Sequence, residues 1–325
     1  MKSVVEDIKK GSFKPVYLFY GEEAYLKQQY KNRLKNAVLP EGDTINLSIY
    51  SGKGMDVNEL ISLADTMPFF SERRLILIED SGFFKNANQQ LAEYIPSIPE
   101  ETIMLFVESE VDKRGKLYKA VSKKGSVVEF TAQNEQTLTR WILGILKTEG
   151  KMITSGAMKQ FLEKTGTDME RIRQELEKLI CYCMEKESIT EEDVAVICSE
   201  QTENKIFDMI NAMAEKKQKK AMELYYDLLA LKEPPMRILY LITRQFNLLM
   251  QVKELSEEGY SAKTISERLK MAGFIVRNCL RQAEYFSLKT LKEALQDCVR
   301  MEEAVKTGRM NDVMSVELLL VKYSS

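Results

Sequence analysis

The sequence contains no histidine among its 325 residues. Histidine is the commonest general base and a frequent zinc ligand, so its absence removes the simplest catalytic triads and many metal sites. Cysteine is also scarce, with five residues and no CxxC pair. An odd number of cysteines without such a pair favours reduced thiols in a cytosolic protein. We therefore expect no catalytic residue, no metal and no cofactor in this chain.

The chain also lacks an apolar run long enough to cross a membrane, and its N-terminus lacks the pattern of a signal peptide. Its net charge of -2 does not favour strong independent binding to nucleic acid. A hydrophobic content of 44% and a charged content of 30% are those of a soluble globular protein. We predict a cytoplasmic protein of two or three domains that does not span a membrane.

Strand and helix patterns alternate along the first part of the chain. LILIE and TIMLFVE are continuous apolar runs, as buried strands of a parallel sheet require. Helical segments separate the strands, among them Asp56–Thr66, where Asp56 and Glu59 resemble a capping box. This alternation predicts βαβ units and a parallel sheet in an α/β domain over residues 1–140. The expected strands are Val16–Tyr20, Ile45–Tyr50, Leu75–Glu79, Thr102–Val107 and Ser126–Phe130.

After Asn134 the patterns become helical. Residues 141–203 predict a small helical domain that resembles a lid, in which Thr190 caps a short helix. Longer helical segments occupy residues 204–325, and Ile238–Val252 is apolar around much of its circumference. We expect this segment at the centre of a helical bundle, with three more helices after it. The predicted fold class is therefore α/β plus all-α.

The first predicted strand ends at Gly21, and helical spacing follows it. Strand, glycine and helix form the frame of a P-loop, in which a GxxxxGK[ST] pattern cradles phosphates. The turn here reads GEEAYLK, with no second glycine and no Gly-Lys-Ser/Thr. Glu22 and Glu23 instead put two carboxylates where anionic phosphates would lie. Glu79 and Asp80 end an apolar strand as a Walker B acid would, but many strands end in acids. The pattern predicts a degenerate P-loop that does not hold ATP.

Two basic stretches are candidate contacts for phosphate or for an acidic partner, although a run of charges is usually a solvated face. The first stretch extends from Lys113 to Lys124 and contains no acid, and the second is EKKQKK. The residues of interest in the first are Lys113, Arg114, Lys116 and Lys119, and those in the second are Lys216, Lys217, Lys219 and Lys220.

The stretch DTMPFFSERRLILI places an apolar cluster in a turn between a helix and a strand. The cluster consists of Met67, Pro68, Phe69 and Phe70, and Pro68 prevents the helix from continuing and stiffens the turn. Large apolar side chains in a loop either pack into the core or contact a partner. A second pair, Phe83-Phe84, follows the next strand and competes with the first on composition.

Five segments in order resemble the delta subunit of the bacterial DNA polymerase III clamp loader, and the resemblance spans essentially the whole chain. They are KPVYLFYGEEAYLKQQ, ADTMPFFSERRLILIED, FVESEVDKRGKLYKAV, LEKLICY and PPMRILYLITRQFNLLMQVKEL. The resemblance implies an AAA+-like fold that has lost its nucleotide site, a lid domain and a helical collar domain that assembles with other subunits.

The resemblance also implies a function for the apolar turn. In this family an apolar pair in the corresponding turn contacts the ring-shaped sliding clamp, and that pair maps onto Phe69 and Phe70. The expected function is a subunit of DNA polymerase III that hydrolyses no ATP and opens the clamp for loading onto primed DNA. The expected partners are the beta clamp, the tau/gamma and delta prime subunits, and primed DNA within the assembled complex. An ATPase with a degenerate nucleotide site and a nucleic-acid-binding adaptor are the alternatives.

Overall fold

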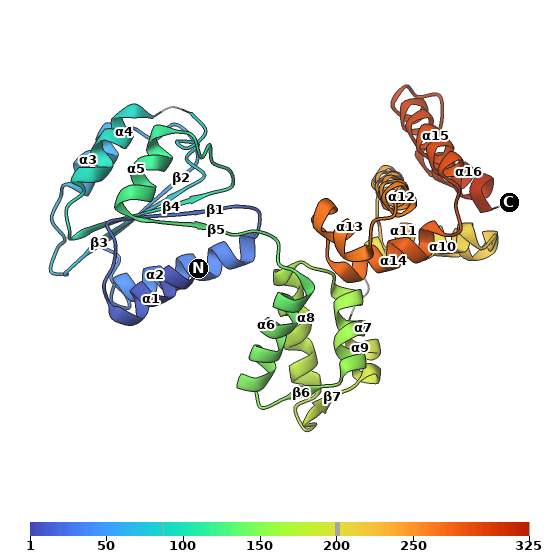
Figure 1. The fold of residues 1–325 in the computed structure, drawn as a ribbon, viewed down its shortest axis with the longest axis horizontal. Coiled ribbons are helices and arrows are strands. Elements are labelled where there is room, and N and C mark those ends of the chain that lie inside the picture. The colour runs from blue at the N-terminus through green and yellow to red at the C-terminus, as the bar shows by residue number, and fades with distance from the viewer. Residues whose placement is uncertain (87, 199–201, 325) are drawn as a thin grey trace. The chain divides into compact units, whose positions relative to one another are not determined.

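The structure is a computed structural model that describes residues 1–86, 88–198 and 202–324 of the chain, apart from the side chain at position 203. The chain divides into two compact units, Met1–Ala132 and Gln133–Ser325 (Figure 1). None of the described helices is long and apolar enough to cross a membrane.

The first unit is built on a five-stranded sheet in the order β2-β3-β4-β1-β5. All neighbouring strands are parallel, so β1 lies between β4 and β5 and the carboxyl ends of the strands share one edge. Each of the five strands predicted from the sequence is present, with ends that differ by two residues at most. The strands are β1 (Val16–Tyr20), β2 (Leu47–Ser51), β3 (Arg74–Glu79), β4 (Thr102–Glu108) and β5 (Ser126–Glu129).

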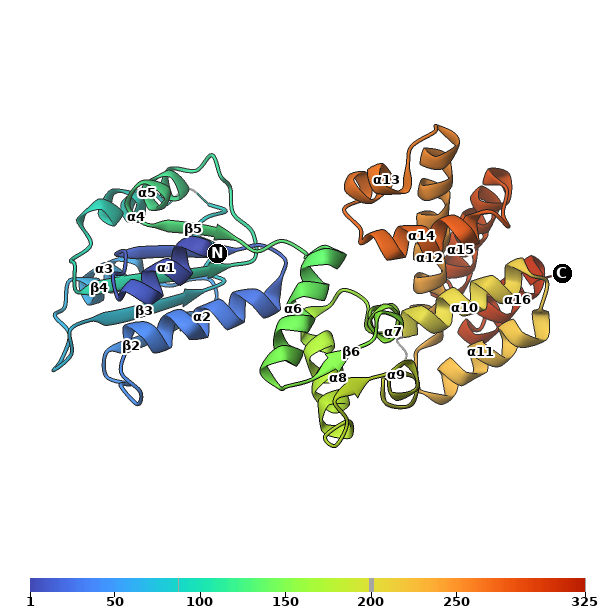
Figure 2. The same ribbon diagram turned by 60° about the horizontal axis from the view of Figure 1, so that its bottom comes forward.

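Helices cover both faces of this sheet (Figures 1 and 2). Helices α1 and α2 lie against one face, and α3, α4 and α5 lie against the other. Because both faces are covered, the central strands are apolar throughout, and every residue of β1 is buried. The helices are α1 (Lys2–Lys10), α2 (Ala24–Val38), α3 (Val57–Ala64), α4 (Gln89–Tyr94) and α5 (Lys116–Lys124), with a short 3-10 helix, η1 (Ile95–Ser97).

The side chains of β1 divide between two cores according to the alternation of a strand. Val16 and Leu18 face α3, α4 and α5, where they pack with Phe106 and Leu117. On the other face, Phe19 meets Phe130 with ring centroids 5.4 Å apart. The sheet therefore joins two hydrophobic layers, and β1 contributes to both of them.

The second unit begins with a group of short elements. Thr190 and Asp193 form a capping box at the start of α9, as the position of Thr190 predicted. Ile172, Leu176 and Leu179 form the buried stripe of α8. The elements are α6 (Glu135–Thr148), β6 (Met152–Ile153), α7 (Ser155–Thr165), α8 (Met169–Tyr182), β7 (Ser188–Ile189) and α9 (Glu191–Ile197).

Seven described helices complete the second unit. The central one is α12, whose buried residues include Ile238, Phe246 and Val252, as its apolar circumference predicted. Four helices follow α12 where three were predicted, because the short helix α13 precedes α14. The helices are α10 (Thr202–Ala214), α11 (Gln218–Ala230), α12 (Pro235–Glu257), α13 (Ala262–Leu269), α14 (Gly273–Ala283), α15 (Leu288–Lys306) and α16 (Asp312–Ser324). The three-part division at residues 140 and 203 stays a prediction.

A buried carboxylate joins the last two helices. Asp297 on α15 accepts hydrogen bonds from Lys322 Nζ at 2.5 Å and from Tyr323 Oη at 2.6 Å, both on α16. Burial alone would raise the pKa of this carboxyl, but the bonds from Lys322 and Tyr323 hold the pKa below its usual value of 3.8. The ionised form is therefore the one that the fold stabilises.

We predict that Asp297→Asn lowers the free energy of unfolding by about 1–3 kcal/mol at pH 7, because it weakens the pairing of the buried Tyr323 hydroxyl and removes the ion pair with the more exposed Lys322. A carboxyl whose pKa is lower in the folded protein than in the unfolded chain stabilises the fold above its unfolded pKa. This stabilisation is lost as the pH falls. The difference in melting temperature between the natural protein and Asp297→Asn should therefore become smaller below about pH 4. A difference in melting temperature that stays constant from pH 7 to pH 3 would contradict this account.

Candidate functional site

The carboxyl edge of the sheet is where a P-loop protein would hold nucleotide, and here the turn after β1 is closed. Gly21 has φ +116°, and a Cβ at this position would lie 2.3 Å from the Phe130 carbonyl oxygen. The Glu23 N–H donates to the same oxygen at 3.1 Å. The turn packs directly against the end of β5, so its backbone does not form a phosphate-binding loop.

Lys27, the one lysine in the expected P-loop position, already has a hydrogen-bond partner within the chain. Lys27 Nζ donates to the Glu108 carbonyl oxygen at 3.1 Å. Burial lowers the pKa of Lys27, while the nearby carboxylates of Asp80, Glu108 and Glu23 oppose this shift. Three acids thus surround one cation at this edge, which disfavours the binding of a polyphosphate.

The acids of this edge have partners within the chain. Glu79 pairs with Lys31 at 2.7 Å, and Asp80 accepts a hydrogen bond from Ser109 Oγ at 2.8 Å. The Glu108 side chain is buried and accepts hydrogen bonds from the Ser81 hydroxyl and backbone N–H. Burial raises the pKa of Glu108. Among the described residues no group of three or more Cys, Asp and Glu side chains is arranged to hold a metal ion.

The apolar turn lies at the opposite edge of the sheet, because it precedes β3 rather than following a strand. The helix before it, α3, is capped by Asp56 and ends at Ala64, two residues earlier than predicted. The four predicted residues then form an exposed cluster. Met67 is 78% exposed, Phe69 56% and Phe70 96%, while Pro68 is partly buried.

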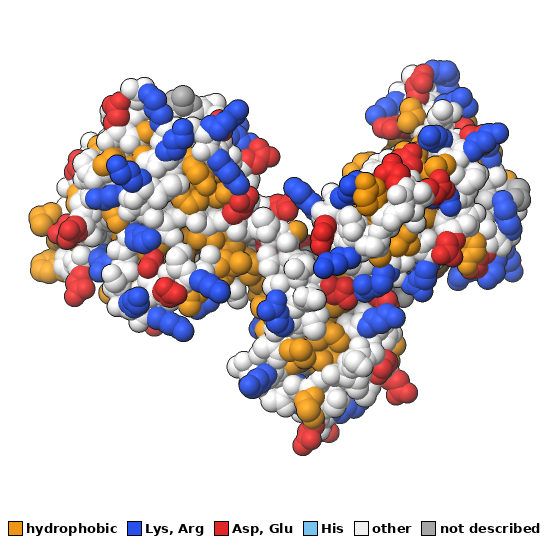
Figure 3. Space-filling model, viewed as in Figure 1, with side chains coloured by type: hydrophobic (Ala, Val, Ile, Leu, Met, Phe, Trp, Pro, Cys, Tyr) orange, Lys and Arg blue, Asp and Glu red, His pale blue; other side chains and the backbone are white. Residues whose placement is uncertain are grey.

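Two aromatic rings dominate this cluster. The centroids of Phe69 and Phe70 are 4.5 Å apart, and the rings meet edge to face at 82°. Hydrophobic side chains stand out from the edge of the first unit that carries this turn (Figure 3). Every other Phe side chain among the described residues is buried or partly buried, and two neighbouring exposed rings of this size are typical of a contact surface.

The competing pair, Phe83-Phe84, belongs to the core. Phe84 is 3% exposed, and its ring packs against Phe106 with centroids 5.2 Å apart. Phe83 is partly buried and packs against the same cluster. Of the two pairs that the composition could not separate, only Phe69-Phe70 is therefore available to a partner.

Sequence analysis missed the residues that hold this turn. The Asn46 side chain binds both backbone groups of Phe69, accepting from its N–H at 2.7 Å and donating to its carbonyl at 2.9 Å. Arg74 Nη2 donates to the Met67 carbonyl at 3.3 Å. Neither contact has a signal in the sequence, because each joins a polar side chain to backbone atoms that only the fold brings near.

The first basic stretch is less available than its composition indicated. Lys113 pairs with Glu129 at 2.8 Å, and Arg114 pairs with Asp112 at 3.1 Å. Lys116 Nζ donates to Gln89 Oε1 at 3.2 Å. Lys116 and Lys119 lie on α5, and Lys113 and Arg114 precede it. A role for the stretch in phosphate or partner contact stays a prediction.

The second basic stretch lies at the turn between α10 and α11. Lys217 pairs with Glu215 at 2.6 Å, and Lys220 lies 4.0 Å from Glu223. Its charges are thus partly balanced by acids of the same turn.

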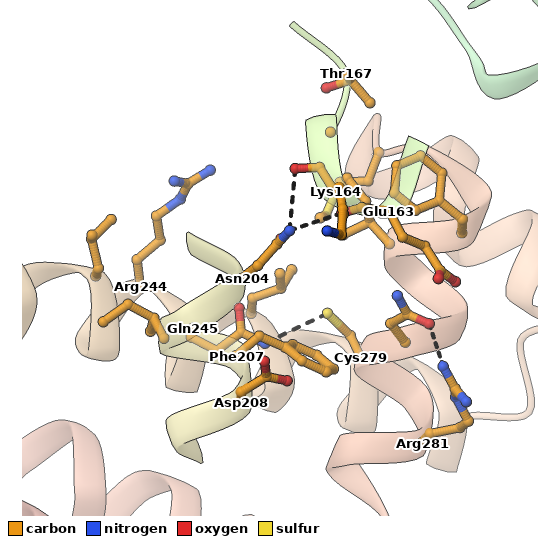
Figure 4. Close-up of a pocket in the computed structure, with 18 of the residues that line it drawn as sticks. Glu163, Lys164, Thr167, Asn204, Phe207, Asp208, Arg244, Gln245, Cys279 and Arg281 are labelled. Atoms are coloured by element: carbon orange, nitrogen blue, oxygen red, sulfur yellow. Dashed lines mark hydrogen bonds between the residues drawn. The ribbon is translucent and has the colours of Figure 1, made fainter. Parts of the chain in front are cut away.

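A groove of about 710 Å³ in the second unit was not predicted (Figure 4). It lies among α7, α10, α12 and α14, and Asn204 bridges its wall by donating to the carbonyls of Glu163 and Lys164. Cys279 lines it, but burial raises the pKa of this thiol to about 11, so the thiol stays protonated at neutral pH. The groove offers polar contacts and no activated nucleophile.

Two family models match this chain over most of its length. The model of the DNA polymerase III delta subunit matches residues 17–131, and a separate model of the C-terminal domain of that subunit matches residues 203–323. The chain belongs to the DNA polymerase III delta subunit family.

Whole-chain relatives agree with this assignment. This chain is 30% identical to the DNA polymerase III subunit delta of Bacillus subtilis, over 98% of this chain and 95% of the relative. It is 21% identical to a probable DNA polymerase III subunit delta of Aquifex aeolicus, over 75% and 72% of the two chains. The solved structure of the Bacillus subtilis DNA clamp loader delta protein matches with a TM-score of 0.69 and 30% identity, covering 99% of each chain.

These comparisons and the structure confirm two predictions for this chain. The family resemblance is confirmed, and so is the fold class of a parallel-sheet α/β domain followed by an all-α part. A delta subunit is an accessory subunit of the polymerase holoenzyme.

We predict that the purified chain hydrolyses no ATP above background, because Lys27 is hydrogen-bonded to the Glu108 carbonyl oxygen and carboxylates lie around it. Phosphate release at saturating ATP should equal that of a Lys27→Ala variant. Fluorescent ATP analogues should show no saturable binding to either protein. Turnover by the natural chain that Lys27→Ala abolishes would show that the site is functional.

Proposed function

We propose that this chain binds the sliding clamp through Met67, Pro68, Phe69 and Phe70, and thereby helps to open it for loading onto primed DNA. The proposal rests on one observation: a member of the delta family presents two neighbouring Phe rings, 56% and 96% exposed, on a proline-stiffened turn. The chain would act in the cytoplasm as a subunit that hydrolyses no ATP. Its partners would be the beta clamp, the tau/gamma and delta prime subunits, and primed DNA.

The exposed rings can supply the affinity that this function requires. Burying one aromatic side chain removes on the order of 150–250 Å² from water. At about 25 cal/mol per Å², each ring gives roughly 4–6 kcal/mol of gross stabilisation. Lost translational and rotational freedom offsets much of this gain. A net contribution of about 2–4 kcal/mol for each ring is typical of an interface hot spot.

Binding alone would not open a closed ring. A ligand shifts a conformational equilibrium only by the difference between its affinities for the two states. The turn must therefore bind the open clamp more tightly than the closed clamp. Two rings at the tip of one short turn suit this role, because they can occupy a pocket that is better formed when the clamp interface has separated.

We predict that Phe69→Ala with Phe70→Ala weakens clamp binding by a factor of roughly 1,000 or more, which corresponds to about 4 kcal/mol. Both rings are largely exposed, so thermal denaturation should be nearly unchanged. Surface plasmon resonance with an immobilised clamp measures the affinity, and release of clamps from circular DNA measures opening.

The control is Tyr182→Ala with Met184→Ala, which removes two other exposed apolar side chains, 50% and 72% exposed, from the second unit. This variant should bind the clamp normally. Normal affinity in the folded Phe69/Phe70 variant would overturn the proposed function of the turn. Equal losses in both variants would show that the contact is non-specific.

We further propose that the helices from residue 204 onward form the collar that assembles with the other loader subunits. Their hydrophobic core is continuous from Ile206 to Tyr323, so the bundle has a core of its own. The apolar side chains of Met314 and Leu318 on α16 are 52% and 44% exposed in the isolated chain. Their spacing of four residues puts them on one face of the helix.

A chain that ends near residue 202 should keep its affinity for the clamp and lose assembly with tau/gamma and delta prime. Circular dichroism would establish that the truncated chain is folded, and size-exclusion chromatography of the reconstituted mixture would report assembly. Co-elution of the truncated chain with the other subunits would show that assembly depends on the remaining residues.

A further inference from the structure

Asn46 is an almost fully buried residue in an exposed segment. It is 1% exposed, whereas its neighbour Ile45 is 64% exposed. A buried carboxamide must find partners for two donors and one strong acceptor. The partners of Asn46 are the backbone of Phe69, 23 residues later in the chain, and the carboxylate of Asp43.

The hydrogen bonds of Asn46 determine which way its side chain points. Asp43 is acceptor-only when ionised, so it must face the NH₂ group, and Asn46 Nδ2 donates to Asp43 Oδ2 at 2.9 Å. The same nitrogen donates to the Phe69 carbonyl at 2.9 Å, and Oδ1 accepts from the Phe69 N–H at 2.7 Å. Asp43 Oδ1 also accepts from the Asn46 N–H at 3.0 Å. The carboxamide thus pairs with Phe69 as a peptide group of a neighbouring strand would.

Phe70, the next residue, has an unusual backbone. Its φ is +49°, in the left-handed region that bulky residues rarely adopt. Its ring is 96% exposed, so no burial within this chain compensates for the strain. Strain of this kind persists only where the surrounding structure imposes it. Asn46 holds Phe69 on one side of Phe70, and the start of β3 at Arg74 restricts the other side.

We propose that Asn46 is a positioning residue that holds Phe69 and Phe70 in the conformation that binds the clamp. This inference rests on the proposed function of the turn. A turn that is ordered before binding loses less conformational freedom when it binds. Without Asn46, only a fraction of molecules would present both rings correctly, and the apparent dissociation constant would rise by the inverse of that fraction.

Three variants test this role. Asn46→Ala removes both bonds to Phe69. Asn46→Asp keeps an acceptor for the Phe69 N–H but places a second carboxylate beside Asp43 and the Phe69 carbonyl. Asp43→Asn with Asn46→Asp restores a donor between the two positions, so it should recover part of what Asn46→Asp loses.

The measurements separate positioning from direct contact. Asn46→Ala should weaken clamp binding roughly 10- to 30-fold, since it removes two hydrogen bonds that hold the turn. The loss should fall on the association rate, because fewer molecules are competent to bind. Phe70→Ala should instead raise the dissociation rate. Hydrogen–deuterium exchange at the Phe69 and Phe70 amides of the free, full-length protein should be faster in Asn46→Ala and Asn46→Asp and slower again in the double variant.

The outcomes also distinguish this inference from the proposed function. If Phe69→Ala with Phe70→Ala abolishes clamp binding while Asn46→Ala binds with normal affinity and normal amide exchange, the positioning role is wrong and the function of the turn stands. If the natural chain does not bind the clamp, the proposed function fails, and amide exchange still shows whether Asn46 orders the turn. A large loss of thermal stability in Asn46→Ala, with amide exchange faster throughout the first unit and not only at Phe69 and Phe70, would assign Asn46 to the fold alone and overturn the proposal.

Discussion

The parallel pairing of β2 with β3 is the constraint on which the candidate site depends. Its register places Leu47 opposite Leu75, so that Asn46 lies opposite Arg74 at the amino ends of the two strands. The Asn46 carbonyl accepts from the Leu75 N–H at 2.9 Å, which extends the ladder by one residue. Asn46 and Arg74 both contact the backbone of the apolar turn, so the strand register determines which side chains can hold it.

The two edges of the sheet differ in structure. Open parallel sheets ordinarily bind ligands beyond the carboxyl ends of their strands. Here that edge is closed by the contact of Gly21 with Phe130 and by the pairing of Lys27 with the Glu108 carbonyl. The exposed rings lie at the amino edge, where loops leave helices and enter strands. A closed carboxyl edge and an exposed apolar turn at the amino edge are therefore compatible within one fold.

Much of the α/β domain could be predicted because its strands are strongly apolar. Continuous runs such as LILIE and TIMLFVE have few alternatives to a buried parallel strand. The number of helices after α12 was harder to predict, because α13 is short and the next helix begins soon after it, at Gly273. For the candidate site, the sequence predicted that Met67 to Phe70 form an apolar cluster in a turn. The sequence also indicated the family, and the family resemblance implied a partner contact at that turn.

The sequence alone determined the succession of apolar runs that become strands, the loss of the P-loop pattern and the presence of two Phe pairs. Each of these depends on residues that are neighbours in the chain. The family resemblance selected Phe69-Phe70, but only the tertiary structure gave the physical reason, because the burial of Phe84 against Phe106 depends on the packing of the segment after β3 over β4. It also revealed Asn46, whose bonds to Phe69 exist only after β2 and β3 have paired. Hydrogen bonds between a side chain and a distant backbone leave no periodic pattern, so no inspection of local sequence could have found them.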